Sequence, residues 1–507
     1  MHTVGIPAHV HDALEKRGFQ ANGSGEVTWL ENSKSHPRQW SLTRKIGDTA
    51  VICVLEFLTT LMSNAGSSIT SDVGMKIGAG REVALLCLVT SYLAGQGLGS
   101  LIFPPIAEVF GGRTIYVAST FGYAVTCLII AACPNLVVVV IFRFLGGFCS
   151  AIPTVVAASS IENMWDSTAR VWVIHIWIAS AVLGLGIGPP VATYAALSPY
   201  GWRSLFYAAA AVLAVVALLC LGMQESRPSK VLRNQVKTVA RKTNFDRLSV
   251  TELDSSPDVN TFIKTTLALP IRLFFTEPIV FFTSTMAAMV YGLTYLFTEA
   301  FSIIYTDHFG LPRQESSLVF LSIAVGVLFT FLPRIYDVKL LKRRASRNTP
   351  MEAEDKLFGF YVAAPVLAIG LWWCAFTVPP LAEGISVWPS IISLLLFGYA
   401  VVEFDNTLCG YLCDTYVQYS ASANAPLAVL RAILSGAFPL YGAQMFKGLG
   451  PNNALFLLAA MATAFCGVAA MFFFYGKRIR QRSPFAEKTW EGAQNTERPE
   501  EPPKHQC

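Results

Sequence analysis

The feature that most constrains this chain is a set of twelve separate runs of about 20 apolar residues, each long enough to cross a bilayer as a helix. One of them, from Leu455 to Tyr475, contains no charged residue. Of the 507 residues, 53% are hydrophobic and only 14% are charged, whereas soluble domains have about 25% charged residues. Such a chain cannot cover its apolar surface with a polar shell. The sequence therefore predicts an all-α polytopic membrane protein with twelve transmembrane helices.

The runs fall into two blocks of six, separated by a long polar interval, which predicts two pseudo-symmetric six-helix bundles. We expect the spans near 46–69, 83–103, 114–133, 136–160, 171–196, 204–222, 278–301, 317–338, 358–377, 387–410, 423–446 and 453–475. The predicted parts are a cytoplasmic N-terminal segment (1–45), an N-terminal bundle (46–222), a cytoplasmic central loop (223–277), a C-terminal bundle (278–475) and a cytoplasmic tail (476–507). The tail is rich in Glu, Pro, Lys and Arg, a composition that predicts disorder.

The distribution of basic residues predicts the orientation. Lys and Arg cluster before the first span, after the last span and in the central loop, whereas the intervals around Pro134 and Pro379 contain none. Because basic loops stay on the cytoplasmic side, both termini are expected there. A short echo supports a duplication, since Gly80-Arg81-Glu82 follows the first span and Pro312-Arg313-Gln314-Glu315 follows the seventh.

Charged residues inside the predicted spans are the main candidates for function, because a charge near the bilayer centre costs about 2.5–3.5 kcal/mol. Arg143 is flanked on both sides by apolar residues and predicts a cavity-facing role, or a structural pair with a neighbouring helix. A fixed positive charge at this depth favours the ionised form of a nearby carboxylate, so that proton and substrate compete for one site. The acidic candidates within the spans are Glu56, Glu299, Glu403 and Asp405.

Two of these carboxylates, Glu403 and Asp405, are about 200° apart around a helix and cannot both face one cavity. Each candidate has two interpretations, either proton coupling or a structural hydrogen bond or ion pair. His175, near a predicted helix start, is interpreted as a satisfied polar group.

A Gly-x-x-x-Gly-Pro run, formed by Gly184, Gly188 and Pro189, lies in the fifth predicted span. Small residues permit close helix approach, and the proline removes one backbone hydrogen bond. The run is consistent with a bending helix and equally with ordinary small-residue packing.

Several classes of function are excluded by the sequence. It contains no phosphate-binding loop, no Gly-x-Ser-x-Gly elbow and no His and Cys cluster spaced for zinc. The eleven Cys residues lack the spacing of a disulfide framework, and the net charge of +5 comes without recognition elements for nucleic acid. We therefore expect no metal, no cofactor, no nucleic-acid partner and no enzymatic activity.

The motifs resemble those of the major facilitator superfamily, over roughly Trp40 to Tyr475. The segment from Pro105 to Arg113 resembles its loop signature, with Gly112 where a second basic residue is usual. Arg143 with Gly147 resembles the fourth-helix signature implicated in proton transfer, and the Gly184 to Pro189 run resembles the fifth-helix signature of antiporters, with Ala192 and Thr193 replacing its closing glycines. The resemblance implies a cytoplasmic gate formed by Glu108, Arg113 and Arg170.

A narrower resemblance is to the fungal twelve-helix drug:proton antiporters. It rests on Trp40-Ser41, Gly201-Trp202-Arg203 and Glu277-Pro278 and on a stretch near spans ten and eleven that includes Tyr411, Asp414, Tyr416, Tyr419, Arg431 and Pro439, with Ala432 in place of a serine.

This resemblance implies proton-coupled export of small organic molecules by alternating access, with the proton gradient as energy source and a carboxylate tuned by Arg143. We expect a monomer whose partners are substrate, protons and the lipid bilayer, in the plasma membrane rather than the vacuolar membrane. An importer or organic-acid facilitator on the same fold and a non-transporting nutrient sensor remain alternatives, since fold does not set direction. The sequence leaves open whether the substrate is a drug, toxin, polyamine or secondary metabolite.

Overall fold

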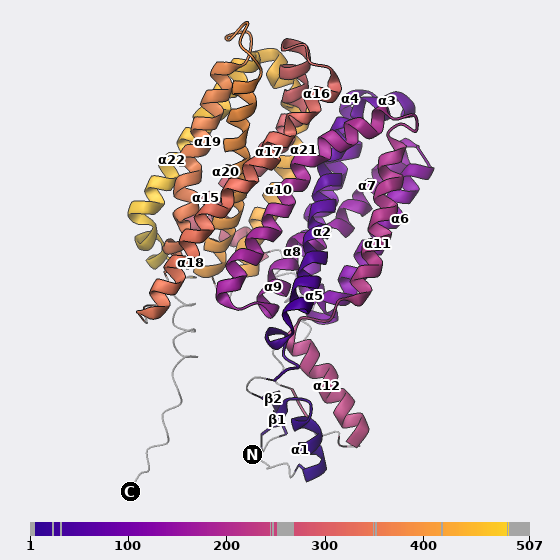
Figure 1. The fold of residues 1–507 in the computed structure, drawn as a ribbon, viewed down its shortest axis with the longest axis vertical. Helices are drawn as coiled ribbons and strands as arrows, with labels where there is room; N and C mark the ends of the chain where they lie inside the picture. The colour runs from indigo at the N-terminus through magenta and orange to yellow at the C-terminus, as the bar shows by residue number, and fades with distance from the viewer. Residues whose placement is uncertain are drawn as a thin grey trace.

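A computed structural model describes residues 6–22, 25–30, 33–243, 245, 248–250, 268–347, 349, 352–416, 419–483 and 485, with the side chains of 108, 109 and 421 excepted. In this part of the chain, twelve helices are long and apolar enough to cross a membrane. They form two bundles that stand side by side (Figure 1). The predicted all-α polytopic architecture is confirmed.

The N-terminal bundle contains the first six spans. Its elements are α2 (Leu42–Ser68), α3 (Thr70–Ile77), α4 (Arg81–Leu85), η2 (Leu86–Thr90), α5 (Ser91–Phe110), α6 (Gly112–Ala132), α7 (Leu136–Ser150), α8 (Ile152–Val155), α9 (Ala157–Met164), α10 (Ser167–Leu197) and α11 (Arg203–Gly222). The second span runs through α4, η2 and α5, and the fourth through α7, α8 and α9. The segment η2 is a π-helical turn.

The C-terminal bundle contains the other six spans. Its elements are α14 (Leu269–Thr276), α15 (Pro278–Phe301), η4 (Ser302–His308), α16 (Arg313–Leu318), α17 (Phe320–Gly326), η5 (Val327–Thr330), α18 (Phe331–Ser346), η6 (Ala353–Leu357), α19 (Phe358–Thr377), α20 (Trp388–Thr415), α21 (Ser420–Leu449) and α22 (Pro451–Gln481).

Corresponding helices pack in the same way in both halves. The first span packs on the fifth (α2 on α10) as the seventh packs on the eleventh (α15 on α21), and α6 packs on α11 as α19 packs on α22. The two halves meet through α5 against α21 and α10 against α17, which are again equivalent pairs. This repetition is the structural form of the duplication that the sequence predicts.

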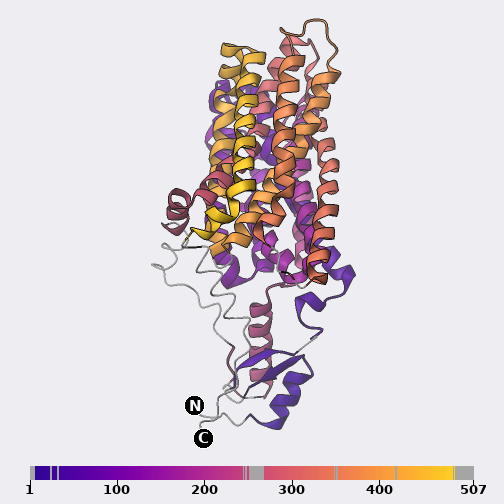
Figure 2. The same cartoon turned by 90° about the vertical axis from the view of Figure 1, so that its left-hand side faces the viewer.

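A small module lies below the bundles, on the side that the sequence predicts to be cytoplasmic, and is built from two distant parts of the chain (Figure 2). It is called the cytoplasmic module below. It consists of α1 (Ala8–Glu15), the antiparallel strands β1 (Phe19–Ala21) and β2 (Val27–Trp29), and α12 (Pro228–Thr243) from the central loop. Leu232, Val236 and Val239 lie on one face of α12 and are buried, because residues four and three apart share a helix face. Their apolar contacts join the two segments into one core.

Two predicted boundaries differ from the structure. The predicted N-terminal segment 1–45 contains α1, β1, β2 and the 3₁₀ turn η1 (Pro37–Gln39), and α2 already begins at Leu42. The predicted tail begins at 476, but α22 continues to Gln481, because its basic last turn pairs with acidic residues near η6. Residues 486–507, where the tail is predicted to be disordered, lie outside the described residues.

Candidate functional site

The candidate site lies between the two bundles, where α2 packs against α15. It contains two carboxylates and one guanidinium, namely Glu56 of α2, Asp405 of α20 and Arg431 of α21. Asp405 pairs with Arg431, and Glu56 is within electrostatic range of both. Two of the four predicted carboxylates, one from each half, therefore act on each other through their charges.

Glu56 is 2% exposed, and its neutral hydrogen-bond partners are the hydroxyl of Thr154 and the indole of Trp177. Thr154 Oγ1 donates to its two carboxylate oxygens at 3.3 and 3.2 Å. Among the described residues, no lysine or arginine forms an ion pair with Glu56. A buried carboxylate without a basic partner can change its protonation state without breaking a salt bridge, which is what a proton carrier requires.

Arg431 is already neutralised within its own half. It forms an ion pair with Asp405, and its guanidinium lies 4.4 Å from the centre of the Tyr291 ring. Tyr291 is followed one turn later on α15 by Tyr295, whose hydroxyl bonds Ser63 of α2 across the interface. The site thus has one net negative charge when both carboxylates are ionised, and its C-terminal wall is aromatic. The role of Arg431 as partner of Asp405 was not predicted, although both residues were singled out.

Arg143 lies deep in the N-terminal bundle and is 1% exposed. Its Nε donates to the carbonyl of Leu88 at 2.8 Å, and its Nη1 and Nη2 donate to the carbonyl of Met62 at 3.3 and 3.2 Å. The guanidinium also lies 4.7 Å from the centre of the Tyr92 ring. The structure does not bring Arg143 together with any of the four predicted carboxylates. In this conformation it joins α2 to η2, and its effect on a carboxylate stays a prediction.

Close packing of α5 against α7 fixes the position of Arg143. A Cβ on Gly147 would collide with the carbonyl of Tyr92, and one on Gly95 would collide with that of Phe144. These glycines let the two backbones approach within reach of the guanidinium. Gly147 of the predicted fourth-helix signature therefore has a packing role.

Glu403 belongs to a second buried cluster, which lies within the C-terminal half. Arg334 of α18 is 2.7 Å from Glu403 and 2.8 Å from Asp337. All three residues are less than 9% exposed. Asp405, two residues after Glu403 on α20, points instead to Arg431, as helical periodicity requires. The sequence analysis missed Arg334 and Asp337, whose i, i+3 spacing inside a predicted span was the available signal.

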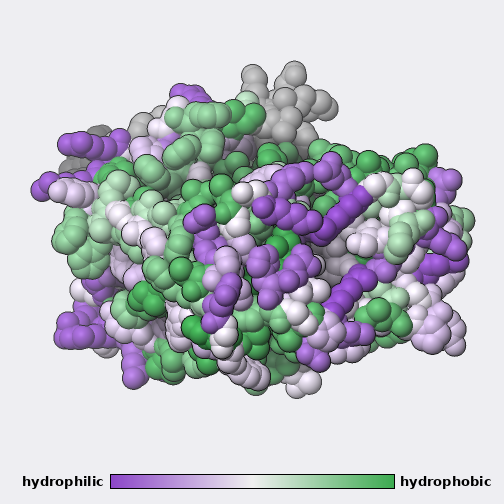
Figure 3. Space-filling model, turned by 90° about the horizontal axis from the view of Figure 1, so that it is seen from above, coloured by the Kyte–Doolittle hydropathy of each residue, from purple (hydrophilic) through white to green (hydrophobic). Residues whose placement is uncertain are grey.

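Glu299, the fourth predicted carboxylate, lies at the end of the interface that the sequence predicts to be extracellular, called the extracellular end below. It pairs with Arg81, which begins the second span, while Arg313, which begins the eighth, pairs with Asp72 at 2.6 Å. Both ion pairs cross from one half to the other. Arg81 and Arg313 are the arginines of the short sequence repeat that follows the first and seventh spans. The duplication has therefore produced two pseudo-symmetric ion pairs between the halves, which we call the extracellular seal. Seen from this end, hydrophilic residues gather across the middle of the molecule (Figure 3).

The predicted cytoplasmic gate residues do not bridge the halves in this conformation. Arg113 Nη2 donates to the carbonyl of Leu221 at 2.7 Å, and Arg170 pairs with Glu162 at 2.7 Å. All four residues belong to the N-terminal half, and the side chain of Glu108 lies outside the described residues. Instead, Glu225 accepts from the backbone N–H groups of Gly112 and Arg113 at the start of α6. The gate assignment stays a prediction.

The fifth-helix run packs against the helix that carries Glu56. A Cβ on Gly184 would collide with Thr60 and the carbonyl of Phe57, and one on Gly188 would collide with the carbonyl of Leu61. The intervening Gly186 faces α17 of the other half. Pro189 lies inside α10, which continues from Ser167 to Leu197. These contacts explain the small residues by close packing, and a bending role stays a prediction.

The remaining residues of the motif near spans ten and eleven lie towards the cytoplasmic side of the C-terminal half. Tyr416 donates to Glu277 Oε2 at 2.9 Å, and Lys356 pairs with Asp414 at 2.5 Å. Tyr411 is fully buried, and Pro439 lies inside α21. Apart from Arg431, these residues tie helices of one half together and do not line the candidate site.

Comparisons with known proteins agree with the fold and identify the family. The model of the Major Facilitator Superfamily matches residues 51–439. The efflux pump FUBT of Fusarium oxysporum is 30% identical over 436 residues, which cover 84% of this chain and 72% of the relative. The major facilitator superfamily multidrug transporter mdrA of Aspergillus fumigatus is 28% identical over 467 residues, with coverage of 92% and 76%.

A solved structure shares the architecture at low sequence identity. The proton:xylose symporter XylE superposes with a TM-score of 0.60 at 14% identity, over 86% of this chain and 96% of that chain. This likeness shows the fold alone, whereas the family match covers more than half of the chain. The chain therefore belongs to the major facilitator superfamily of multi-pass membrane transporters, and its relatives include fungal efflux pumps and multidrug transporters.

Proposed function

We propose that this protein is a proton-coupled efflux transporter that exports small organic molecules by alternating access. The observation that carries the proposal is Glu56, a carboxylate that is buried between the halves and is held by the hydroxyl of Thr154. Efflux as the direction is supported by the relative named as an efflux pump. The substrate would bind beside Glu56, against Tyr291 and the Arg431–Asp405 pair.

The coupling follows from competition at Glu56. When the carboxyl group is protonated, the site carries no net charge. When the proton leaves, the site gains one negative charge next to the Arg431–Asp405 pair, and its affinity for a bound molecule changes. In this proposal the structure is a state closed to the outside, and the ion pairs between the halves at the predicted extracellular end support that assignment. A change of charge at the centre shifts the balance between this state and an outward-open one.

The working unit in this proposal is a single chain in the plasma membrane. Both halves that alternating access requires belong to the same chain, with Glu56 in the first half and Asp405 and Arg431 in the second. We propose no enzymatic step and no cofactor, because the energy would come from the proton gradient.

The test uses purified protein in liposomes with an imposed pH gradient and an internal pH-sensitive dye. Rhodamine 6G, spermidine and benzoate serve as probes of the aromatic, polyamine and organic-acid classes. We expect one class to trigger proton movement in the wild type and not in Glu56→Gln. The matched control is Glu162→Gln, because Glu162 is exposed and pairs with Arg170 outside the site.

Two results would overturn the proposal. Proton movement that persists in Glu56→Gln would remove Glu56 as the coupling group. Accumulation of the probe along with protons, rather than against them, would make the protein a symporter and reverse the assigned direction.

A further inference from the structure

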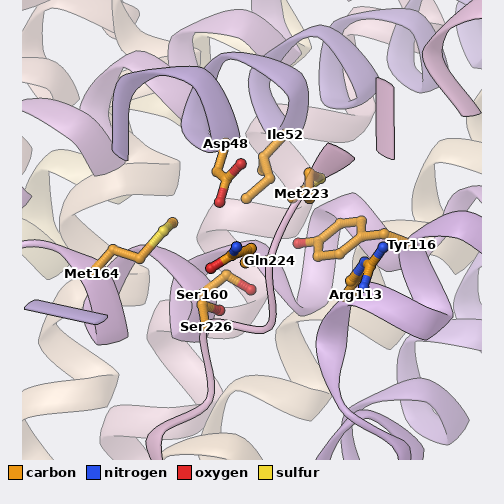
Figure 4. Close-up of a pocket in the computed structure, with 9 residues that line it drawn as sticks. All are labelled: Asp48, Ile52, Arg113, Tyr116, Ser160, Met164, Met223, Gln224 and Ser226. Carbon is orange, nitrogen blue, oxygen red and sulfur yellow. The ribbon is translucent and has the colours of Figure 1, made fainter. Parts of the chain in front are cut away.

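The two halves differ in how their first spans begin on the predicted cytoplasmic side. Near the start of α2, Asp48 lines a small polar cavity together with Arg113, Ser160 and Gln224 (Figure 4). Its volume is about 10 Å³, enough for one water molecule and too little for an organic ligand. The equivalent helix of the C-terminal half, α15, is instead preceded by the short helix α14. The proposed function uses neither feature.

Helix α14 exposes large apolar side chains on one face. Ile271 and Phe275 are four residues apart and therefore share a face, and they are 60% and 78% exposed. Pro270 and Leu273 are buried, on the side where α14 packs against α21 and α15. An apolar face of this kind needs a partner that keeps it from water.

The exposed face continues into the surface of a membrane span. The ring centre of Phe274 lies 5.1 Å from that of Phe275 and 5.2 Å from that of Phe281. Phe281 is in the first turn of α15, which belongs to the seventh span, and is 40% exposed. A row of aromatic rings therefore joins the apolar face of α14 to the surface that α15 presents to lipid.

The polar side of α14 lies towards the predicted cytoplasm. Arg272 and Thr276 are each one residue after a member of the apolar pair, and are therefore turned by about 100° around the helix. The guanidinium of Arg272 lies 5.6 Å from the ring centre of Phe485, which follows the basic last turn of α22. Thr276 Oγ1 donates to the carbonyl of Arg272 at 2.7 Å, so this hydroxyl is satisfied within the helix.

The junction between α14 and α15 places α14 beside the end of the span. Glu277 has φ −108° and ψ 108°, an extended conformation that interrupts the helix. Its carboxylate accepts a hydrogen bond from Tyr416 at 2.9 Å, which ties the junction to the end of α20. Figure 2 shows α14 projecting from the side of the bundles at their lower end. The helix therefore lies where the seventh span enters the bilayer.

We propose that α14 is an interfacial helix whose apolar face, Ile271 and Phe275, inserts into the phospholipid leaflet on the cytoplasmic side. Arg272 stays at the level of the headgroups, because a long basic side chain reaches from an apolar surface towards water. The partner is the bilayer, since the face is continuous with the lipid-facing surface at Phe281. The helix thereby holds the start of α15, which carries Tyr291 of the candidate site, at a fixed depth. This inference does not depend on proton coupling.

The experiment measures the depth of a nitroxide spin label on the protein in phosphatidylcholine nanodiscs. The label is attached at Phe275→Cys or, as the matched control, at Thr276→Cys, with Cys133, Cys413 and Cys507 replaced by Ser. Collisions with oxygen, which dissolves among the acyl chains, are compared with collisions with a nickel chelate, which stays in water. The label at residue 275 should lie about 5–10 Å into the boundary between headgroups and acyl chains. The label at residue 276 should collide more often with the nickel chelate.

Ile271→Cys keeps the test decisive if Phe275→Cys does not fold, because residue 271 lies on the same face. A label on this face that the nickel chelate reaches as often as the label at residue 276 would overturn the inference, since the face would then be in water. A label that neither reagent reaches would also overturn it, because a protein surface, such as a second copy of this chain, would then cover the face. The measurement requires no transport, so its failure would leave the proposed function untouched.

Discussion

At the extracellular end of the interface, Arg81 and Arg313 each reach across to a carboxylate of the opposite half. At the cytoplasmic end, Arg334 and Lys356 pair with acidic residues of their own half, and so does Arg170. A pair within one half is kept whatever the relative position of the halves. A pair between the halves must break when they separate. The comparison indicates that ion pairs within one half stabilise the fold, whereas ion pairs between the halves set the balance between conformations.

The largest effect expected from this comparison is a complete loss of transport when the extracellular seal is made covalent. Asp72→Cys with Arg313→Cys, joined by a short bifunctional thiol reagent, should stop turnover, because the outward-open state can no longer form. The loss of turnover is measured as transport of the probe before and after cross-linking. Cys133 and Cys413 are exposed and should be replaced by Ser in all variants.

The matched control for the cross-link between residues 72 and 313 is a cross-link within one half. Glu352→Cys with Lys477→Cys joins two residues that already pair inside the C-terminal half, and should leave turnover unchanged. If the Asp72/Arg313 cross-link also left turnover unchanged, the extracellular pairs would not form a seal that opens.

The second prediction concerns stability. Arg334→Ala leaves Glu403 and Asp337 buried without their partner and should cost about 3–5 kcal/mol of folding free energy. Thermal unfolding in detergent measures the loss, and Arg313→Ala is the control because its ion pair is partly exposed, at 38% and 24%, and lies between the halves. Similar unfolding temperatures for the two variants would contradict the division into structural and conformational pairs.

The third prediction is a shift in the balance between conformations. Glu299→Gln removes the charge that holds Arg81 and should favour the outward-open state by about 1 kcal/mol, or about fivefold in population. Ser63→Cys lies at the interface beside Tyr295, so its rate of labelling by an external impermeant thiol reagent reports opening. Glu315→Gln, an exposed change at the same end, should leave the rate unaltered. A labelling rate in Glu299→Gln equal to that of the control would show that this pair does not hold the seal.

The smallest effect is expected at an exposed pair. The hydrogen bond from Lys477 holds the pKa of Glu352 below its ordinary value of 4.5. A lowered folded-state pKa stabilises the protein at pH values above 4.5, and this contribution is lost as the pH falls through the folded-state pKa. Because the two side chains are 56% and 36% exposed, Lys477→Ala should cost about 0.5 kcal/mol or less at pH 7. Unfolding curves of the wild type and Lys477→Ala at pH 7 and pH 4 test this prediction. The difference in stability between the two proteins should shrink at pH 4, and a larger difference at pH 4 would contradict the prediction.

Some details of the fold could be predicted because they depend on local composition. The twelve spans follow from apolar runs that have no other way to avoid water, and the orientation follows from basic loops. The cytoplasmic module was missed because its core joins Phe19 and Val27 to Leu232 and Val236, more than 200 residues away in the sequence. Short amphipathic segments give no signal of such a distant partner.

The sequence alone determined that this protein spans a membrane, in two halves, with charges inside its spans at Glu56, Arg143, Glu299, Glu403 and Asp405. The cost of placing a charge in the bilayer marks such residues, whatever surrounds them. Only the tertiary structure decided their partners. Arg143 binds backbone carbonyls, Arg431 pairs with Asp405, and Glu56 is left with neutral partners. The reason is geometric, because a pairing between helices depends on their rotation and depth against each other, and packing of glycines and large side chains sets both.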